Sequence, residues 1–145
     1  AEPMSPATRQ NVGLLIARLG LGFMLMLHGL PKIFVSNLFG NEVSWYFLGK
    51  EAFPFLEITE LYAIAGLLIA LIETFGGICL MLGVLHKQVT ASLFIIFIAA
   101  FFARIDDAKG AMDLAEEAGW PFELAVFMAT LFCLGPGDYK FGRGR

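Results

Sequence analysis

Four long apolar runs, separated by short polar breaks, restrict this chain to the class of helical membrane proteins. We expect membrane-spanning helices at about residues 12–33, 58–85, 89–105 and 120–134. A spanning helix needs about 20 apolar residues, because the hydrocarbon core is about 30 Å thick and each helical residue rises about 1.5 Å. The fourth run covers only about 22 Å by this measure, so protein is expected to shield its outer end. The composition agrees, since 58% of the residues are hydrophobic and only 16% are charged.

These runs predict one all-α domain, a four-helix transmembrane bundle, over residues 12–141. Residues 1–11 are expected to form a mobile N-terminal tail, and residues 142–145 a C-terminal tail. The segment between the first two helices, Phe34–Glu57, is too polar to span a membrane and is rich in aromatic residues. Aromatic rings concentrate at the membrane interface, which predicts an interfacial anchor; a lid over a lipophilic ligand is the alternative. Residues 106–119 are expected to form a short surface helix.

The positions of lysine and arginine predict the orientation of the helices. Cytoplasmic loops carry an excess of these residues. Five lie on the side that contains both tails and the 86–88 break, and four lie on the other side. We therefore expect both termini in the cytoplasm. The net charge of −3, without a basic stripe, argues against a nucleic-acid partner.

Glu73 lies near the middle of an otherwise apolar stretch, Leu61–Leu85. An ionised carboxylate at that depth is unstable unless it is protonated, paired or directed at a polar cavity. Two interpretations stay open at this point. Glu73 belongs to a functional site, or it makes an ion pair or hydrogen bond that clamps two helices together.

Polar residues and glycines form two stripes, one on each of the first two spans, at about 100° per residue. The first stripe consists of Arg18, Leu25, His28, Gly29 and Lys32. The second consists of Thr59, Tyr62, Gly66, Ile69, Glu73 and Gly77. Glycines allow two helix backbones to approach closely in lipid. The stripes therefore predict a polar seam between the two spans, with Arg18 as the expected charged partner of Glu73.

His28 and Lys32 are four residues apart and so face the same way, which predicts that they meet at the outer mouth of the seam. The further candidates there are Glu57, Glu60, Arg104 and Glu123. The alternatives are that Lys32 and Arg104 extend to the lipid headgroups, and that His28 makes an ordinary hydrogen bond between helices.

The sequence offers few ligands for metals or haem. Its two histidines, His28 and His86, are expected near opposite faces, so no haem or metal is expected to be held by this chain alone. Cys79 and Cys133 do not form a CxxC motif and are expected to pack as small apolar residues. Any redox chemistry must then involve a lipophilic carrier or a cofactor held by another subunit.

Four segments resemble the DoxX family and occur in that family's order. They are ARLGLGFMLMLHGLPKIF, LIETFGGICLMLGVLHK, the FE of GWPFE and LGPGDYKF. The resemblance covers about residues 12–141. It implies a four-helix protein associated with membrane oxidoreductases, including the quinone-reducing subunit of thiosulfate:quinone oxidoreductase. The matching positions are Arg18, His28, Lys32, Glu73, Gly76, Gly77, Glu123 and Tyr139. Many members carry a histidine near the end of the third span, where this chain has Arg104, which argues against histidine-dependent or metal-linked chemistry.

We therefore expect an integral subunit of a quinone-linked, respiratory or sulfur-oxidising, oxidoreductase complex in a bacterial or archaeal cytoplasmic membrane. Its expected partners are membrane lipids and other subunits of that complex. Glu73 and His28 are the candidate catalytic residues. The candidate quinone-contacting residues are His28, Lys32, Tyr62, Arg104 and Glu123. The alternative is a non-catalytic structural subunit whose seam only fastens the helices, so whether the chain is an enzyme stays open.

Overall fold

A computed structural model describes residues 4–34, 45–105 and 109–142, and every regular element within these ranges is a helix. The elements are α1 (Pro6–Phe34), α2 (Trp45–Ala52), the 3-10 helix η1 (Pro54–Leu56), α3 (Thr59–Leu82), α4 (His86–Ile105), α5 (Ala111–Glu117) and α6 (Gly119–Leu134). By length and composition α1, α3 and α4 can each cross a membrane, and α5 with α6, bent by 57°, makes a fourth candidate. The expected all-helical membrane class is confirmed, with three spans or up to four.

The first helix starts earlier than the sequence suggested. It begins at Pro6, inside the segment that we expected to be a tail. The hydroxyl of Ser5 accepts a hydrogen bond from the backbone N–H of Thr8 at 3.2 Å, and proline is favoured in a first turn because it has no N–H to satisfy. Asn11, which is a plausible cap by residue type, lies within α1 instead.

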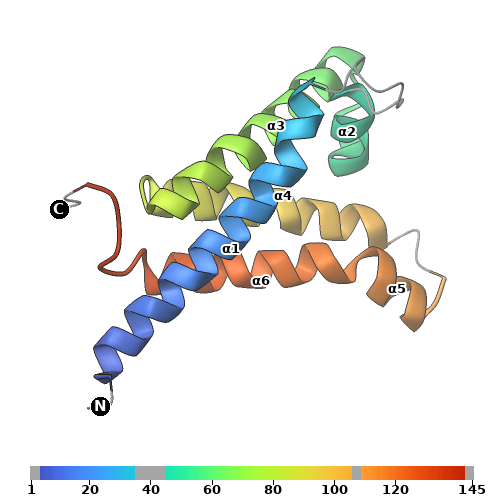
Figure 1. The fold of residues 1–145 in the computed structure, drawn as a ribbon. Helices are drawn as coiled ribbons and strands as arrows, with labels where there is room; N and C mark the ends of the chain where they lie inside the picture. Colours follow the sequence, from blue (N-terminus) through green and yellow to red (C-terminus); the bar gives the residue numbers. More distant parts are fainter. Residues whose placement is uncertain (1–3, 35–44, 106–108, 143–145) are drawn as a thin grey trace.

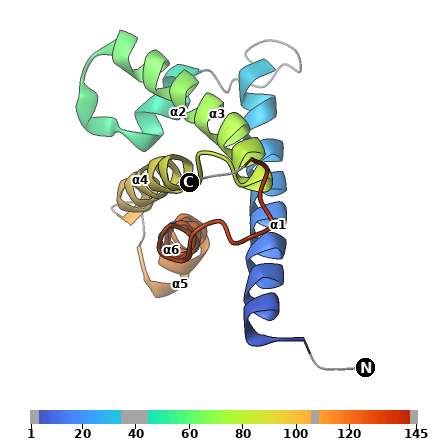
Figure 2. The same ribbon diagram turned by 90° about the vertical axis from the view of Figure 1, so that its left-hand side faces the viewer.

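The helices form two adjacent pairs. In Figure 1, α1 runs along α3 in the opposite direction, with α2 packed on α3, and α4 runs along α6. Figure 2 looks along α4 and α6 and shows the α1–α3 pair beside them. Both ends of the chain and the turn between α3 and α4 lie at one end of the molecule, whereas α2 and α5 lie at the other (Figure 1).

Glycines set the close contact between α1 and α3. A methyl group placed on Gly22 would lie 2.5 Å from the carbonyl oxygen of Gly77, and a methyl group on Gly77 would lie 2.5 Å from that of Gly22. About two turns further along α1, a methyl group on Gly29 would lie 2.5 Å from the hydroxyl of Thr74. No side chain larger than hydrogen fits at these crossings, so the predicted contact between the first two spans is confirmed.

Replacing Gly22 by leucine should therefore force α1 and α3 apart and lower the free energy of unfolding by about 1–3 kcal/mol, the usual cost of overpacking. The matched control is Gly20→Leu, because a methyl group on exposed Gly20 meets nothing within 4 Å. Unfolding of both variants in lipid–detergent micelles, followed by circular dichroism, measures the difference. Equal stability of the two variants would contradict this account of the crossing.

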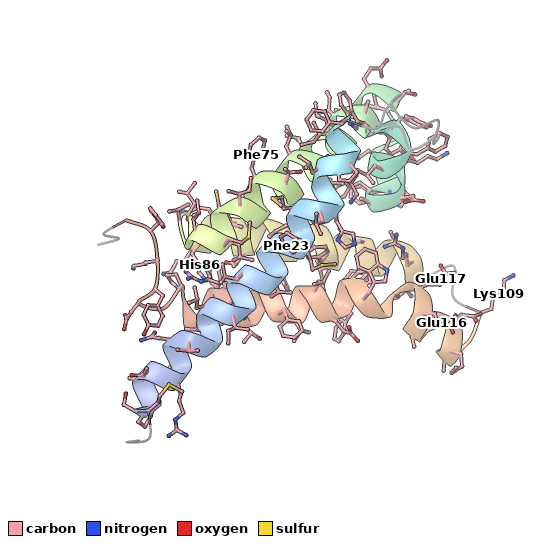
Figure 3. The ribbon with its side chains drawn as sticks, viewed as in Figure 1. Phe23, Phe75, His86, Lys109, Glu116 and Glu117 are labelled. Atoms are coloured by element: carbon pink, nitrogen blue, oxygen red, sulfur yellow. The ribbon has the colours of Figure 1, made fainter. Side chains whose placement is uncertain are left out.

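The outer surface of the helices suits contact with lipid. Many large apolar side chains are exposed, among them Phe23 on α1 and Phe75 on α3, and Figure 3 shows both projecting from the ribbon. Charged side chains are found instead near α5, where Lys109, Glu116 and Glu117 lie at the end of the molecule (Figure 3). This distribution is that of an integral membrane protein.

Residues 135–141, here called the C-terminal strap, close the end of the molecule where both chain ends lie. Four hydrogen bonds join the strap to the helices. Asn11 Nδ2 donates to Asp138 Oδ2 at 2.5 Å, and the N–H of Asp138 donates to Asn11 Oδ1 at 3.2 Å. Arg18 Nη2 donates to the carbonyl oxygen of Tyr139, and the N–H of Phe141 donates to the carbonyl oxygen of Leu82 at 2.8 Å. The strap thus joins the first turns of α1 to the last turn of α3.

Candidate functional site

A partly buried ion pair joins α1 to α3. Lys32 Nζ lies 2.5 Å from Glu73 Oε2, and the two side chains are 25% and 7% exposed. This pairing corrects the sequence-based expectation that Arg18 would be the partner. The crossing of Gly22 with Gly77 fixes the register, which places Glu73 beside Gly29. The side chain of Lys32 leans back toward the start of its helix, as helical side chains do, and so reaches the level of Glu73.

Arg18 lies about four helical turns from Lys32 along α1, at the other end of the seam. It is fully buried, and its guanidinium lies against Gly83 at the end of α3. Its described hydrogen bond goes to the carbonyl oxygen of Tyr139 in the strap. Arg18 therefore belongs to the closure of the bundle and is separate from the site around Glu73.

The main cavity, of about 370 Å³, lies between α1, α3, α4 and α6. Its lining residues are Leu21, Met24, Leu25, His28, Lys32, Glu73, Phe97, Trp120, Glu123, Leu124 and Phe127. Four candidates from the sequence meet here, namely His28, Lys32, Glu73 and Glu123. The remaining walls are apolar or aromatic. The cavity thus combines a few convergent polar groups with an apolar surround, which is the usual design of a small-molecule site.

A second, smaller cavity of about 60 Å³ lies on the other side of the ion pair. It shares Lys32, Glu73, Phe97 and Trp120 with the main cavity, and its further lining residues are Leu48, Glu51, Ala52, Ile69, Ile96, Ala100 and Arg104. The guanidinium of Arg104 lies over the ring of Trp120, 4.9 Å from its centroid. The ion pair and Trp120 therefore form a common wall between the two cavities.

His28 is oriented by its own helix. Its Nδ1 lies 2.8 Å from the carbonyl oxygen of Met24, so Nδ1 carries the hydrogen that is donated. The tautomer leaves Nε2 as the ring nitrogen that a ligand can use. Neutral His28 accepts a hydrogen bond at Nε2, as from a hydroxyl, and protonated His28 donates one, as to a carbonyl.

Tyr62, a candidate from the sequence, lines neither cavity. Its hydroxyl donates to the carbonyl oxygen of Pro54 at 2.7 Å and accepts from the N–H of Glu57 at 3.2 Å. The ring thus fastens η1 to α3. Tyr62 lies on the stripe that the sequence indicated, but α2 covers this part of α3, because Gly66 meets the backbone of Trp45.

The expected aromatic lid is only partly visible. Residues 35–44 of the predicted segment lie outside the described residues. Helix α2 covers the small cavity through Leu48, Glu51 and Ala52, whereas the main cavity has no wall from the described part of this segment. In the described part of the segment, the side chains that line the small cavity are thus aliphatic or acidic, and none is aromatic.

Sequence reasoning missed Trp120 and Glu51 as site residues. Trp120 lines both cavities, and Glu51 lines the small one. Trp120 directly precedes Pro121 at the start of the short fourth apolar run, and this position could have indicated an aromatic residue at that end of the bundle. Glu51 gave no comparable signal, because only the packing of α2 on α3 brings it near Glu73.

Within the described ranges, no three His, Cys, Asp or Glu side chains are grouped closely enough to hold a metal ion.

Comparison with known proteins identifies the chain. The family model of DoxX matches residues 13–106, which is more than half of the sequence. The chain belongs to the DoxX family. The DoxX match runs from within α1 to the end of α4 and therefore includes Arg18, His28, Lys32 and Glu73, whereas Glu123 and Tyr139 lie beyond it. No curated protein and no solved structure matched the chain.

Proposed function

We propose that this DoxX protein is a membrane subunit of a quinone-linked oxidoreductase complex and that its main cavity contacts the quinone. One observation carries the proposal: His28, Lys32, Glu73 and Glu123, which come from three helices, line one otherwise apolar cavity. Polar side chains inside a membrane are costly. Their convergence is therefore better explained by a ligand than by helix packing alone.

The size and walls of the cavity support a flat lipophilic ligand. Ligand sites commonly measure about 300–1,000 Å³, and the cavity, at about 370 Å³, suits a single substituted ring. Phe97, Trp120 and Phe127 give it aromatic walls. Met24 and Phe127 are about half exposed, so the cavity opens toward the lipid-facing surface. A ligand with an isoprenoid tail can enter sideways and leave the tail in the bilayer.

The polar groups support the exchange of protons with such a ligand. Reduction of a quinone to a quinol takes up two electrons and two protons, and we assign the electrons to a redox subunit that binds this protein. The ammonium group of Lys32 can donate to a quinone carbonyl. Nε2 of His28 can hold a hydroxyl or a carbonyl, according to its protonation. Glu73 and Glu123 are the groups placed to give or accept a proton.

The proposal includes a membrane arrangement. We infer that α5 and α6 together form a fourth span, that α2 and η1 lie at the interface, and that both termini are cytoplasmic. The grouping of both chain ends at one end of the molecule supports this topology (Figure 1). Trp45, Tyr46 and Phe47 on α2 have the amphipathic or apolar rings that anchor in the interface.

Fluorescence of Trp120 provides a direct test of quinone binding. The chain has two tryptophans, so the Trp45→Phe variant leaves Trp120 as the reporter in the wall of the cavity. We expect a short-tailed quinone to quench it with saturation. His28→Ala and Lys32→Ala should each weaken binding about tenfold, as expected for one lost hydrogen bond to a buried ligand.

Lys87→Ala is the matched control, because Lys87 is an exposed lysine that lines neither cavity. The same two variants should slow quinone reduction in membranes while the protein still inserts. If quenching does not saturate and turnover is unchanged in both, the protein is a structural subunit whose polar seam only fastens its helices.

A further inference from the structure

The small cavity has a different character from the main one. Four charged side chains line it, one from each of four helices: Lys32 on α1, Glu51 on α2, Glu73 on α3 and Arg104 on α4. The main cavity shares two of them, Lys32 and Glu73, and adds His28 and Glu123. The two cavities thus meet at the same ion pair, and the small one adds Glu51 and Arg104 to an otherwise apolar lining.

The volume of the small cavity suits water. A cavity needs about 10–15 Å³ of probe-occupied volume for each water molecule, so about 60 Å³ has room for roughly four to six. Each of the four charged side chains can hydrogen-bond to water. The small cavity therefore has room for a few water molecules beside the ion pair.

The small cavity leads from the surface to the ion pair. Glu51 is exposed on α2, at the end of the molecule that is opposite to both chain ends (Figure 1). The side chain of Glu73 is only 7% exposed, so it has little contact with the surroundings of its own. The small cavity connects the exposed carboxylate to the buried one.

We propose that the small cavity is a hydrated proton passage from Glu51 to the Lys32–Glu73 pair, open to the aqueous phase at the α2 end. A proton moves from a solvent acid to the Glu51 carboxylate, along the water molecules, and to the Glu73 carboxylate; only O–H bonds form and break. Arg104, held over the ring of Trp120, lines the passage beside both carboxylates.

The passage separates the route of protons from the route of ligand. A lipophilic ligand enters the main cavity from the bilayer, whereas protons reach the same ion pair from water at the α2 end. The use of these protons in quinone reduction rests on the proposed function. The existence of the hydrated passage does not.

Thiol labelling tests the passage without any ligand. Ala100 lines the small cavity, and Ala99, its neighbour on α4, lines neither cavity. Each is changed to cysteine in a chain whose Cys79 and Cys133 are replaced by serine. The probe is a membrane-impermeant methanethiosulfonate with a trimethylammonium group, added to sealed vesicles of either orientation. The thiol reacts as its thiolate, which forms only where water reaches the sulfur. Ala100→Cys should therefore react at least about tenfold faster than Ala99→Cys. The reaction should occur only when the reagent is on the α2 side.

Equal rates for the two variants, or reaction of Ala100→Cys from the side of the chain ends, would overturn the passage. The result can be separated from the fate of the proposed function. Labelling of Ala100→Cys without quinone quenching of Trp120 would retain the passage and reject the quinone site. Quenching without labelling would do the reverse.

Glu51→Gln tests the role of the entry group. A positioned acid or base contributes about 10²-fold or more to a proton transfer, so the loss of one relay group should slow quinone turnover at least about fivefold. Quinone quenching of Trp120 should not change, because Glu51 does not line the main cavity. Glu60→Gln is the control, since Glu60 is an exposed acid in the first turn of α3 that lines neither cavity. Unchanged turnover in Glu51→Gln would exclude it as the entry.

Discussion

Lys32→Met should lower the free energy of unfolding by about 2–3 kcal/mol. A fully buried ion pair that loses one partner typically costs more, about 3–5 kcal/mol. The loss in Lys32→Met is expected because Glu73, 7% exposed, would be left without its cation, and a buried carboxylate without a partner must take up a proton or draw in water. Glu73→Gln should cost less. Lys32 is 25% exposed, and its long side chain can turn toward water or toward Glu123 in the main cavity.

The double variant Lys32→Met/Glu73→Gln isolates the pairing energy. If the two side chains interact as described, its loss of stability should be smaller than the sum of the single losses. Lys50→Met is the control, because Lys50 is an exposed lysine on α2. Additive losses would show that the two residues do not depend on each other.

Met24→Phe should remove quinone binding with little loss of stability. Met24 lines the main cavity and is 50% exposed, so a larger ring there occupies the opening without crowding the core. Because a ligand cannot share that space, the quinone concentration for half-maximal quenching of Trp120 should rise at least about tenfold, which is a loss of about 1.4 kcal/mol. Leu27→Phe is the control, since Leu27 is exposed on α1 and lines neither cavity.

The comparison of these two variants also locates the site. If Met24→Phe and Leu27→Phe show the same half-maximal quinone concentration for quenching, the quinone contacts Trp120 from outside the main cavity. The main cavity would then lose its assignment as the quinone site, even if the protein still bound quinone.

The sequence predicted the helices well where one physical signal dominated. The lengths of the apolar runs predicted the ends of α1, α3, α4 and α6 to within three residues, except for the start of α1. The start of α1 was missed because it depends on a local cap, with Ser5 ahead of Pro6, and the apolar pattern begins only later. The turn after α3 was predicted to within three residues. Helix α3 ends at Gly83, whose φ of 73° lies in the left-handed region that favours glycine.

Side-chain partners were harder to predict than helix faces. Spacing of four residues was enough to place His28 and Lys32 on one face. The partner of Glu73 depends instead on how far α3 slides along α1, and this register is set by the contact of Gly22 with Gly77. About four helical turns along α1 separate Lys32 from Arg18, and helical periodicity contains no information about which of the two lies level with Glu73.

The contact of Arg18 with the strap has a consequence for how the protein is made. Arg18 enters the membrane with α1, but its acceptor, the carbonyl oxygen of Tyr139, lies 121 residues later in the chain. Until Tyr139 has been synthesised, the guanidinium has to be accommodated by water, lipid headgroups or the insertion machinery. Helix α1 is thus completed by a segment that follows α6 in the chain, and the strap can settle over α1 only after α6 has been inserted.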